Sequence, residues 1–558
     1  MADPLHDVVI VGSGAGGGAA AWALSRHGAR VLVLEAGPAF DPFKDYRLSS
    51  NDWEQHGFPE KPGSQGRHTF APLQALGARW QSLRSWNRQS GPLIMGGQRR
   101  VHAYHHVRGV GGTTLHFTGE AHRLHPKAMK MKSQFGVAAD WPLDYDELEP
   151  YYLLAERVVG VAGPATGQQR PRSAPYPLPA HRLSYASERL RAGAQNLGLT
   201  WVANSLAALS LPYQGRPACN YCGNCNRGCP RTDKGSVDVT FLRQALATGR
   251  CMIKPQCQVT GIEAGSRDRV DAVIYRDASG TARKVAAKAV IVACGAVETP
   301  RLLLLSKSRN APEGLANETG LVGKNFMETV HWASSGLHPE PLGSHRGLPS
   351  DSICWDFNAP DAIPGTLGGC RLYSAVAEAD LVGPINYAAR AVQGWGKAHK
   401  RSLRQVFGRA LSVAAIGESL PNPRSYVDLD PEARDSTGLP LARIHSFLPD
   451  HELTRLEFMA RKSREILQAS GVEQLFEEYG TYDRFSATHV FGTCRMGREP
   501  GASVVDRYGR CHRWRNLFIA DASVFPSSGG GEAPSLTIEA LAIRTSEHLI
   551  ELTKRREL

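Results

Sequence analysis

Apolar and small residues come in blocks at the start of the chain. Residues 8–11 form an uninterrupted apolar run, as in a strand buried on both faces of a sheet, and residues 31–34 repeat it. The segment between them is rich in alanine and glycine, which suits a helix packed closely on the sheet. This order predicts a βαβ unit with two parallel strands.

Similar blocks return later in the chain. Residues 289–293 form a continuous apolar strand that leads into an apolar helix at 301–305, so the first lobe is still being built near residue 300. Between residues 331 and 484, alternating segments predict a separate lobe based on a sheet. Helices are predicted at 145–159, where acidic residues fill the first turn, and at 535–554.

The turn after the first strand has the spacing of a dinucleotide-binding loop. Gly12 allows the tight turn, Gly14 lets the backbone approach a pyrophosphate at the helix start, and Gly17 allows the helix to pack closely on the strand. Glu35 ends the second strand, where a carboxylate can accept hydrogen bonds from ribose hydroxyls. Because this carboxylate would repel a 2′-phosphate, NAD and FAD remain as candidates and NADP does not.

A second glycine loop lies at residues 108–114, which suits an extended dinucleotide lying across the domain. The glycines of the chain cluster in short runs, as they do where backbone approaches a ligand closely. The segment 38–100 is rich in Gly, Trp and Pro, and we expect it to lie outside the core as a lid over the cofactor.

Composition narrows the class of protein. The 558 residues exceed what one hydrophobic core needs, so we expect two or more lobes. With 42% hydrophobic and 21% charged residues the chain is an ordinary globular protein, and no apolar run reaches the roughly 18 residues of a membrane span. Residues 1–7 lack the basic region of a signal peptide, so any export would depend on a partner's signal. The net charge of +12 permits attraction to phosphate, an anionic membrane or an acidic partner without indicating any of them.

Four of the eleven cysteines are bunched, and the other seven are scattered singly, which argues against a disulfide framework. Cys219, Cys222, Cys225 and Cys229, followed by Pro230, have the C-x2-C-x2-C-x3-C spacing of ferredoxin-type iron–sulfur ligands. We therefore expect an iron–sulfur cluster, 3Fe-4S or 4Fe-4S, on three or all four of these cysteines. A structural zinc ion and a metal-free cysteine-rich loop remain as alternatives.

Taken together, these segments resemble the glucose–methanol–choline (GMC) family of FAD-dependent oxidoreductases along nearly the whole chain. The resemblance rests on the first glycine loop and on further motifs: Gly111-Gly112-Thr113-Thr114, Trp141-Pro142 with Pro150-Tyr151-Tyr152, Gly295-Ala296-Val297-Glu298-Thr299-Pro300 with Ser306, Val322-Gly323-Lys324-Asn325-Phe326, and His489-Val490-Phe491-Gly492-Thr493-Cys494-Arg495-Met496. Lys307 departs from it, because the family signature prefers glycine there.

The resemblance implies an α/β fold, α+β overall. It places a discontinuous, Rossmann-like FAD-binding domain at 1–330 and 486–558, with the cysteine loop at 216–232, and a mainly antiparallel-sheet substrate-binding domain at 331–485. By family position, the FAD contacts are Gly12, Gly14, Gly17 and Glu35 on the ADP half, Val259 near the adenine, Gly112 and Thr113 on the flavin side, and Asp521 and Thr537 at the pyrophosphate or ribityl chain.

The cysteine run makes the chain similar to the catalytic subunits of bacterial glucose, gluconate, fructose and sorbitol dehydrogenases, which pair FAD with an iron–sulfur cluster. The position of Cys222 departs from their spacing, whereas Cys219, Cys225 and Cys229 match. The resemblance implies a small partner subunit with an export signal, a cytochrome c as electron acceptor, and a periplasmic location by co-export, with a cytoplasmic location as the alternative. Gly228-Cys229-Pro230 also occurs in members that oxidise long-chain alcohols, where a cluster is less secure.

Oxidation of an alcohol by flavin needs a base that takes the hydroxyl proton, with a pKa of about 6 to 7. The resemblance assigns this role to His489. The family's second catalytic position, usually His or Asn, holds Ala533 here, which cannot donate a hydrogen bond from its side chain. Glu532 is our candidate for a replacement, although residues one apart do not normally point the same way, and a structural role is the alternative. His116 is a further candidate beside the second glycine loop.

We therefore expect a dehydrogenase that oxidises a hydroxyl group of a sugar, glycoside or other alcohol by hydride transfer to flavin N5, with electrons leaving through the cluster. An oxidase of long-chain or sterol-type alcohols with structural cysteines is the alternative enzyme. A non-catalytic flavoprotein is the alternative of another class, favoured by Ala533 and opposed by His489.

Overall fold

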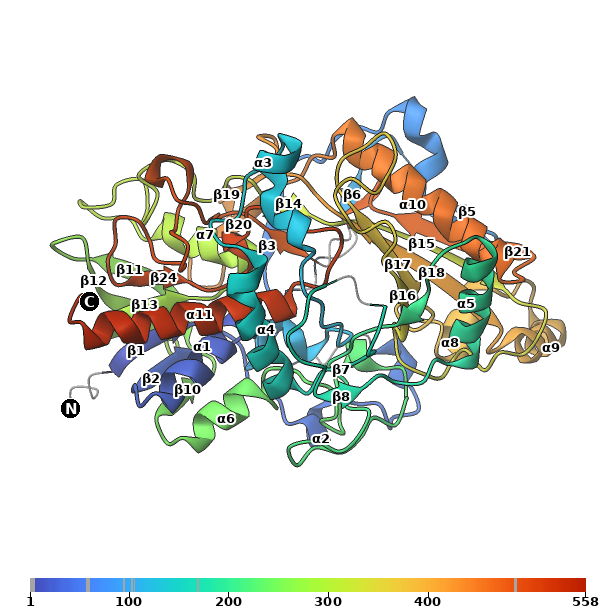
Figure 1. Ribbon diagram of the computed structural model, residues 1–558, viewed down its shortest axis with the longest axis horizontal. Helices are drawn as coiled ribbons and strands as arrows, with labels where there is room; N and C mark the ends of the chain where they lie inside the picture. Colours follow the sequence, from blue (N-terminus) through green and yellow to red (C-terminus); the bar gives the residue numbers. More distant parts are fainter. Residues whose placement is uncertain are drawn as a thin grey trace.

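The molecule has two lobes built on two separate sheets (Figure 1). The computed structural model describes residues 6–56, 61–93, 96–101, 104, 106–167, 170–485 and 489–558. Strand β1, which begins at His6, and the carboxyl terminus lie at the outer end of the first lobe (Figure 1). Within the described ranges, no helix is long and apolar enough to cross a bilayer.

The first lobe is built on a seven-stranded sheet with the order β10-β2-β1-β13-β12-β11, to which β24 adds beside β13. The pairs that join β10, β2, β1, β13 and β24 are parallel, whereas β11, β12 and β13 pair antiparallel. The strands are β1 (His6–Val11), β2 (Val31–Leu34), β10 (Cys251–Lys254), β11 (Gln258–Ala264), β12 (Val270–Arg276), β13 (Ala282–Val292) and β24 (Leu517–Ile519).

Helix α1 (Ala15–Arg26) packs against α11 (Ser535–Lys554), the last helix of the chain (Figure 1). The predicted βαβ unit is confirmed, and so are the helices predicted at 145–159 and 535–554. The remaining helices of the chain are α2 (Pro42–Asp45), α3 (Met131–Phe135), α4 (Tyr145–Val159), α5 (Tyr185–Asn196), α6 (Phe241–Ala247), α7 (Gly295–Leu305), α8 (Pro384–Arg390), α9 (Gly396–Val406) and α10 (Asp450–Ala469).

The second lobe is built on an eight-stranded sheet with the order β5-β4-β21-β15-β18-β17-β16-β9, in which every pair is antiparallel. Its strands are β4 (Trp86–Asn87), β5 (Gly91–Pro92), β9 (Val202–Ala203), β15 (Val330–Leu337), β16 (Ser352–Cys354), β17 (Cys370–Ser374), β18 (Ala410–Gly417) and β21 (Gln474–Gly480).

Alternation along these strands separates two faces of the second sheet. Trp332, Leu372 and Val413 pack on the face that α10 and α5 cover. Ala333, Tyr373 and further residues of the same strands form a second cluster on the opposite face. An antiparallel sheet with one helix-covered face leaves the other face available to line a site between the lobes.

The other strands in the described residues form small sheets of two or three strands. These are β3 (His68–Phe70), β6 (Arg100–Val101), β7 (Ala162–Gly163), β8 (Leu178–Pro179), β14 (Met327–Glu328), β19 (Tyr426–Arg434), β20 (Pro440–His445), β22 (Arg484–Phe485) and β23 (Val490–Phe491). β3 pairs with β20, and β14 pairs with β23.

The expectation that residues 38–100 lie outside the core is wrong for part of that segment. β4 and β5 extend the second sheet, and Trp80 and Leu83 are buried in the core between that sheet and its helices. The second sheet also takes β9 from before residue 330, so it draws strands from outside the expected range 331–485. Sequence periodicity misses strands of two residues because so short a segment carries no measurable period.

Candidate active site

The two glycine loops meet backbone to backbone. A Cβ on Gly112 would lie 2.7 Å from the Cα of Gly14, and Gly112 has a φ of +55°, which a larger residue rarely adopts. No side chain caps the N-terminus of α1, so its first N–H groups are available to an anion. Gly14 and Gly112 therefore form a cradle of bare backbone, which fits the pyrophosphate of a dinucleotide.

Gly12 and Gly17 are needed for packing. A Cβ on Gly12 would lie 2.5 Å from the carbonyl oxygen of Ala293, and one on Gly17 would lie 2.0 Å from that of Gly12. Sequence analysis missed Gly16, where a Cβ would lie 1.6 Å from the carbonyl oxygen of Ala520. Gly16 is what allows α1 to touch the strand end that the carboxyl-terminal segment contributes.

Glu35 has a structural task that sequence analysis did not anticipate. Its Oε2 accepts hydrogen bonds from the N–H and hydroxyl of Ser13, at 3.1 and 2.7 Å. Its Oε1 accepts from the N–H groups of Gly37 and Gly109, at 2.9 and 3.0 Å. Burial raises the pKa of this carboxyl, while these donors oppose the shift. Glu35 thus holds both glycine loops together, and its bond to a ribose stays a prediction.

Asp521 and Thr537 lie beside the same loops, on elements from the end of the chain. The Asp521 Oδ2 accepts from the Thr299 hydroxyl at 2.6 Å and from the Gly295 N–H at 3.0 Å, which joins α7 to the segment after β24. The Thr537 hydroxyl lies in the first turn of α11, 2.9 Å from the hydroxyl of Tyr152.

Two other predicted FAD contacts are half-buried. Thr113 lies in the short helical turn Gly112–Leu115, and Val259 lies at an irregularity in the pairing of β11 with β12. The expected contacts of Thr113 on the flavin side and of Val259 near the adenine stay predictions.

His489 immediately precedes β23, and its Nδ1 is buried without a hydrogen-bond partner among the described residues. The pKa of His489 is lowered to about 3, chiefly by burial and also by the positive charge of Arg371, and the negative charge of Glu120 partly opposes this shift. His489 is therefore a neutral imidazole at physiological pH, able to accept a proton, although its pKa lies below the range expected from the chemistry.

Glu532, the candidate for the missing side chain at position 533, is engaged by residues of other segments. Its Oε1 accepts from the Arg170 guanidinium at 2.7 Å and from the His125 N–H at 3.1 Å, and the side chain is fully buried. Since this carboxylate is engaged in an ion pair, the structural alternative is favoured over a catalytic role. His116, the other candidate, is half-buried at the end of the second glycine loop.

Sequence analysis missed His122. Its Nδ1 accepts from the N–H of Ala533 at 3.0 Å, and its Nε2 donates to the Asn204 side chain at 2.9 Å. His122 is buried, and it contributes to the low pKa of His489. It is one of 20 histidines and belongs to no motif that we recognised, so no sequence signal pointed to it.

A buried ion pair joins the two lobes near His489. Arg371, on β17, donates both terminal N–H groups to Glu120, at 2.6 and 2.5 Å, and its Nε donates to the carbonyl oxygen of Gly531 at 2.5 Å. Glu120 follows the second glycine loop in sequence. This pair fixes the second sheet relative to the loop expected to lie beside the flavin.

Glu378 is a second titratable group at this lobe interface. It accepts hydrogen bonds from the hydroxyls of Tyr373, on β17, and Thr118, which follows the second glycine loop. Burial and the negative charge of Glu120 raise the pKa of Glu378 to about 7.

The four bunched cysteines are free thiols at different depths. Cys225 is buried, Cys219 and Cys229 are half-buried, and Cys222 is exposed. The N–H of Tyr221 donates to the Cys219 sulfur at 3.4 Å, and burial raises the pKa of Cys219, Cys225 and Cys229. In the part of the chain that the structure describes, no three His, Cys, Asp or Glu side chains converge as ligands of one metal ion.

Lys234 connects this cysteine run to the second glycine loop. Its ammonium is buried and donates to the carbonyl oxygens of Leu115 at 2.9 Å, Phe117 at 3.0 Å and Cys225 at 2.7 Å. Its positive charge lowers the pKa of Cys225 and Cys229 against the effect of burial. Lys234 therefore favours negative charge on the sulfurs, as in thiolates that bind iron.

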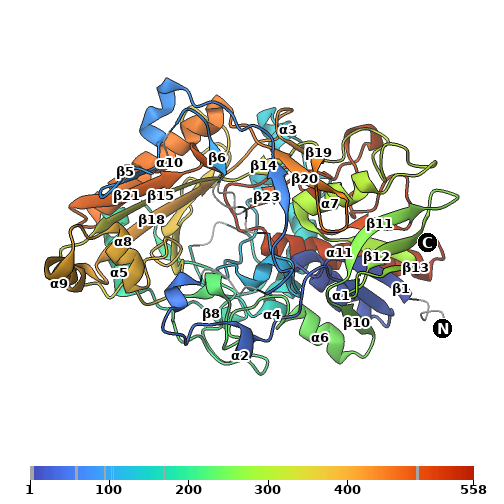
Figure 2. The ribbon, with the colours of Figure 1, turned by 180° about the vertical axis from the view of Figure 1, so that it is seen from behind.

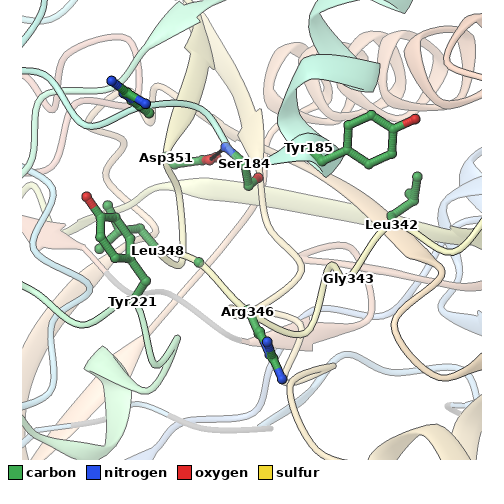
Figure 3. Close-up of a pocket in the computed structure, with 10 residues that line it drawn as sticks. Ser184, Tyr185, Tyr221, Leu342, Gly343, Arg346, Leu348 and Asp351 are labelled. Atoms are coloured by element: carbon green, nitrogen blue, oxygen red, sulfur yellow. Dashed lines mark hydrogen bonds between the residues drawn. The ribbon is translucent and has the colours of Figure 1, made fainter.

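A cavity of about 280 Å³ is lined by Tyr221, next to the cysteine run, and His489 is not among its lining residues. Figure 3 shows Tyr221 at this cavity, with Arg346 from another segment. Tyr221, which lies between Cys219 and Cys222, forms one wall, and Arg182 and Arg346 also line it. The Tyr221 hydroxyl is 3.0 Å from His181 Nδ1, and its carbonyl oxygen accepts from the Gly347 N–H at 3.0 Å. The exposed side of the cysteine run is thus an ordered surface.

Comparison with known proteins agrees with this geometry. Two family models described as GMC oxidoreductase match residues 76–331 and 421–542, and one for an NAD(P)-binding Rossmann-like domain matches residues 10–40.

Three relatives match nearly the whole chain. 2-Methyl-1,2-propanediol dehydrogenase of Mycolicibacterium austroafricanum is 27% identical, over 97% of this chain and 95% of its own. The fructose dehydrogenase large subunit of Gluconobacter japonicus is 28% identical, over 98% of both chains. 6'''-Hydroxyparomomycin C oxidase of Streptomyces lividus is 29% identical, over 98% of this chain and 91% of its own.

Among solved structures, pyridoxine 4-oxidase from Mesorbium loti has a TM-score of 0.62 at 19% identity, over 98% of this chain and 99% of its own. This likeness shows the fold, which confirms the predicted combination of a Rossmann-like domain with an antiparallel sheet.

Gly17→Ala should deplete FAD from the purified protein. The added methyl would lie 2.0 Å from a backbone oxygen, so α1 must move away from β1 and from the pyrophosphate cradle. The flavin-to-protein absorbance ratio measures the loss of bound FAD. We expect the affinity for FAD to fall at least about tenfold. Gly501→Ala is the control, because nothing lies within 4 Å of its added Cβ. A Gly17→Ala protein with full flavin content would contradict the assignment.

Glu532→Ala should destabilise the protein by about 3 to 5 kcal/mol, since it leaves the Arg170 charge buried and uncompensated. Asp361→Ala is the matched control, because its ion pair with Lys127 is half-exposed and contributes under about 1 kcal/mol. Denaturant unfolding of the two holoproteins measures both effects. If Glu532→Ala were as stable as the control, the ion pair of Glu532 with Arg170 would not stabilise the fold, and its structural role would be contradicted.

Proposed function

This chain belongs to the GMC oxidoreductase family, and we propose that it is a dehydrogenase that oxidises a hydroxyl group of a sugar, glycoside or other alcohol. In this proposal the chain is an FAD-dependent enzyme acting on CH–OH donors, as the dehydrogenases and oxidase among its relatives suggest by name. Electrons then leave one at a time through an iron–sulfur cluster on the run from Cys219 to Cys229, and reach a partner such as a cytochrome c.

The residues of the first lobe fit FAD. Gly12, Gly14, Gly17 and Gly112 supply the backbone cradle for the pyrophosphate, and Glu35 keeps the two loops in register. When bound, FAD supplies the acceptor of the hydride that leaves the carbon of the alcohol.

His489 takes the hydroxyl proton on its Nδ1, which is buried, unpartnered within the described part of the chain and neutral. The ion pair of Glu120 with Arg371 keeps the sheet of the second lobe fixed opposite this imidazole. Ala533 occupies the second catalytic position of the family, and its side chain cannot donate a hydrogen bond to the substrate oxygen.

The observation that carries the electron-relay part of the proposal is the bridge made by Lys234. One buried ammonium binds the loop at Leu115 and Phe117 and also the backbone of Cys225, so the expected flavin side and the cysteine run are neighbours. A buried positive charge beside thiols stabilises their thiolates, which are the ligands of iron–sulfur clusters. The exposed Cys222 and the cavity at Tyr221 give an acceptor access to this run.

The acceptor and the location are further parts of the proposal. A relative named as a large subunit supports a complex with further subunits, and we propose a small export partner and a cytochrome c. Co-export with that partner would place the enzyme in the periplasm, with the cytoplasm as the alternative.

A second candidate is an oxidase that transfers electrons directly to oxygen, with the cysteines structural. One observation favours it: in the described ranges, no three of these thiols converge on one ion. Stoichiometric hydrogen peroxide during turnover under air would support the oxidase, whereas reduction of cytochrome c without peroxide would support the dehydrogenase.

His489→Ala should slow substrate-driven flavin reduction by about 10²- to 10⁴-fold while FAD stays bound, because the cofactor loops lie elsewhere. Anaerobic stopped-flow bleaching across a panel of sugars, glycosides and alkanols measures the rate. Since the neutral imidazole is the active form, the rate is lost only as pH falls through its pKa of about 3, so it should stay level down to about pH 4. A change in the reduction rate near pH 7 that disappears in Glu378→Gln would be assigned to the titration of Glu378.

Fast reduction in His489→Ala together with a collapse in Glu532→Gln would move the base to the glutamate.

Iron analysis tests the cluster independently of activity. The purified holoprotein should contain about three or four irons per chain, with a paramagnetic resonance signal in one redox state. Cys225→Ser should lose most of this iron, while Cys257→Ser, at a buried cysteine outside the run, should retain it. Stoichiometric zinc without iron would contradict the relay.

A further inference from the structure

One tryptophan of this chain is almost entirely in solvent. Trp395 is 88% exposed, far more than any other large hydrophobic residue among the described residues except Phe43, which is 77% exposed. Gly394 and Gly396 flank it with φ angles of +84° and +66°, so the chain turns sharply on both sides and projects the indole outward. An indole in this position presents a large apolar surface to solvent.

The helix that follows Trp395 is basic on its outer side. In α9, Lys397, Lys400, Arg401 and Arg404 are exposed and share one stripe at helical spacing. No ion pair involves any of the four within the part of the chain that the structure describes. The charges on this stripe are therefore not compensated by ion pairs with the described residues.

The opposite side of α9 is anchored. Leu403 and Val406 pack against the cluster that contains Leu381, Tyr387 and Phe476. The helix is thus a fixed part of the second lobe, and its exposed stripe has a defined orientation.

The surrounding sequence shares the charge bias. From Leu381 to Gly417 the chain contains six Lys or Arg residues and no Asp or Glu. Two of the six, Arg390 and Arg409, bind groups of the protein, Glu477 and the carbonyl oxygen of Pro339. The other four are those on the exposed stripe of α9.

This surface lies at one end of the molecule. Figures 1 and 2 show α9 at the extreme end of the second lobe, opposite β1 and the carboxyl terminus in both views. A projecting end can contact a flat surface without obstruction from the rest of the protein.

We propose that Trp395 and the basic stripe of α9 are a docking site for the surface of an anionic lipid bilayer. The indole enters the interfacial region, where tryptophan is favoured because it combines an apolar body with an N–H donor. The four cations bind acidic headgroups, and each such residue strengthens binding to an anionic surface severalfold. A flat anionic surface satisfies both features together, whereas an anionic protein would not need so protruding an indole. This contact is peripheral, and it is independent of the proposed dehydrogenase activity.

Vesicle sedimentation of the flavin-loaded protein tests the proposal. At low ionic strength, the wild type should bind vesicles of phosphatidylglycerol and phosphatidylcholine, and should not bind vesicles of phosphatidylcholine alone. Trp395→Ser should weaken binding by about tenfold. The triple variant Lys400→Gln, Arg401→Gln, Arg404→Gln should weaken it by about 100-fold. All of these residues are exposed, so flavin content and thermal stability should not change.

The matched control removes the same charge at the other end. Lys554→Gln, Arg555→Gln, Arg556→Gln neutralises three exposed residues near the carboxyl terminus, and it should change binding by less than about threefold. Equal losses in the two triple variants would show a general effect of net charge and overturn the site.

Fluorescence identifies the residue in contact. Vesicles should shift the emission of the wild type to the blue, and Trp395→Phe should abolish the shift although nine other tryptophans remain. An unchanged shift in Trp395→Phe, or no binding of the wild type to anionic vesicles, would overturn the proposal. The proposal would also be overturned if the wild type bound no vesicles and the α9 variant instead lost binding to a protein partner, because the surface would then be a protein interface.

Discussion

The first lobe depends on close contacts between backbone segments that leave no room for a Cβ atom. Gly17 touches the turn at Gly12, and Gly16 touches Ala520 at the end of β24. The second contact brings the carboxyl-terminal segment onto the amino-terminal βαβ unit, so that α11 packs on α1. Helix α1 then meets the second glycine loop with bare backbone on both sides, which is what a dinucleotide requires.

Buried charged side chains connect the glycine loops of the first lobe to the rest of the molecule. Glu35 binds both glycine loops, Glu120 and Arg371 join the loop region to the second sheet, and Lys234 joins it to the cysteine run. Each of these groups is expensive to bury, and each is satisfied by several hydrogen bonds from segments distant in sequence. The three predicted centres, cofactor, base and cysteines, therefore keep fixed positions around one loop.

The parts of the fold with a strong period or a motif were predictable. The βαβ unit and the helices at 145–159 and 535–554 followed from apolar periodicity and from glycine spacing, whereas the family was indicated by a resemblance in several motifs distributed along the chain. Four further residues were not predictable, because their importance arises from contacts with residues far away in sequence. These are Gly16, His122, Arg371 and Lys234. Glu532 illustrates the same limit: its neighbour Ala533 suggested a catalytic substitute, but Arg170 from another segment engages its carboxylate. The two-residue strands β4, β5 and β9 were too short to show a period, and only pairing with the second sheet defines them.

Flash photoreduction of the bound flavin, under anaerobic conditions and without any alcohol, tests the central claim most directly. If the cysteine run carries a cluster coupled to the flavin, the reduced flavin should pass one of its two electrons to the cluster within milliseconds, and the visible absorbance of the cluster should bleach at the same rate. Added cytochrome c should then be reduced by one electron at a time. A flavin that stays fully reduced until oxygen is admitted, with no change at other wavelengths, would contradict the account and identify an oxidase with structural cysteines.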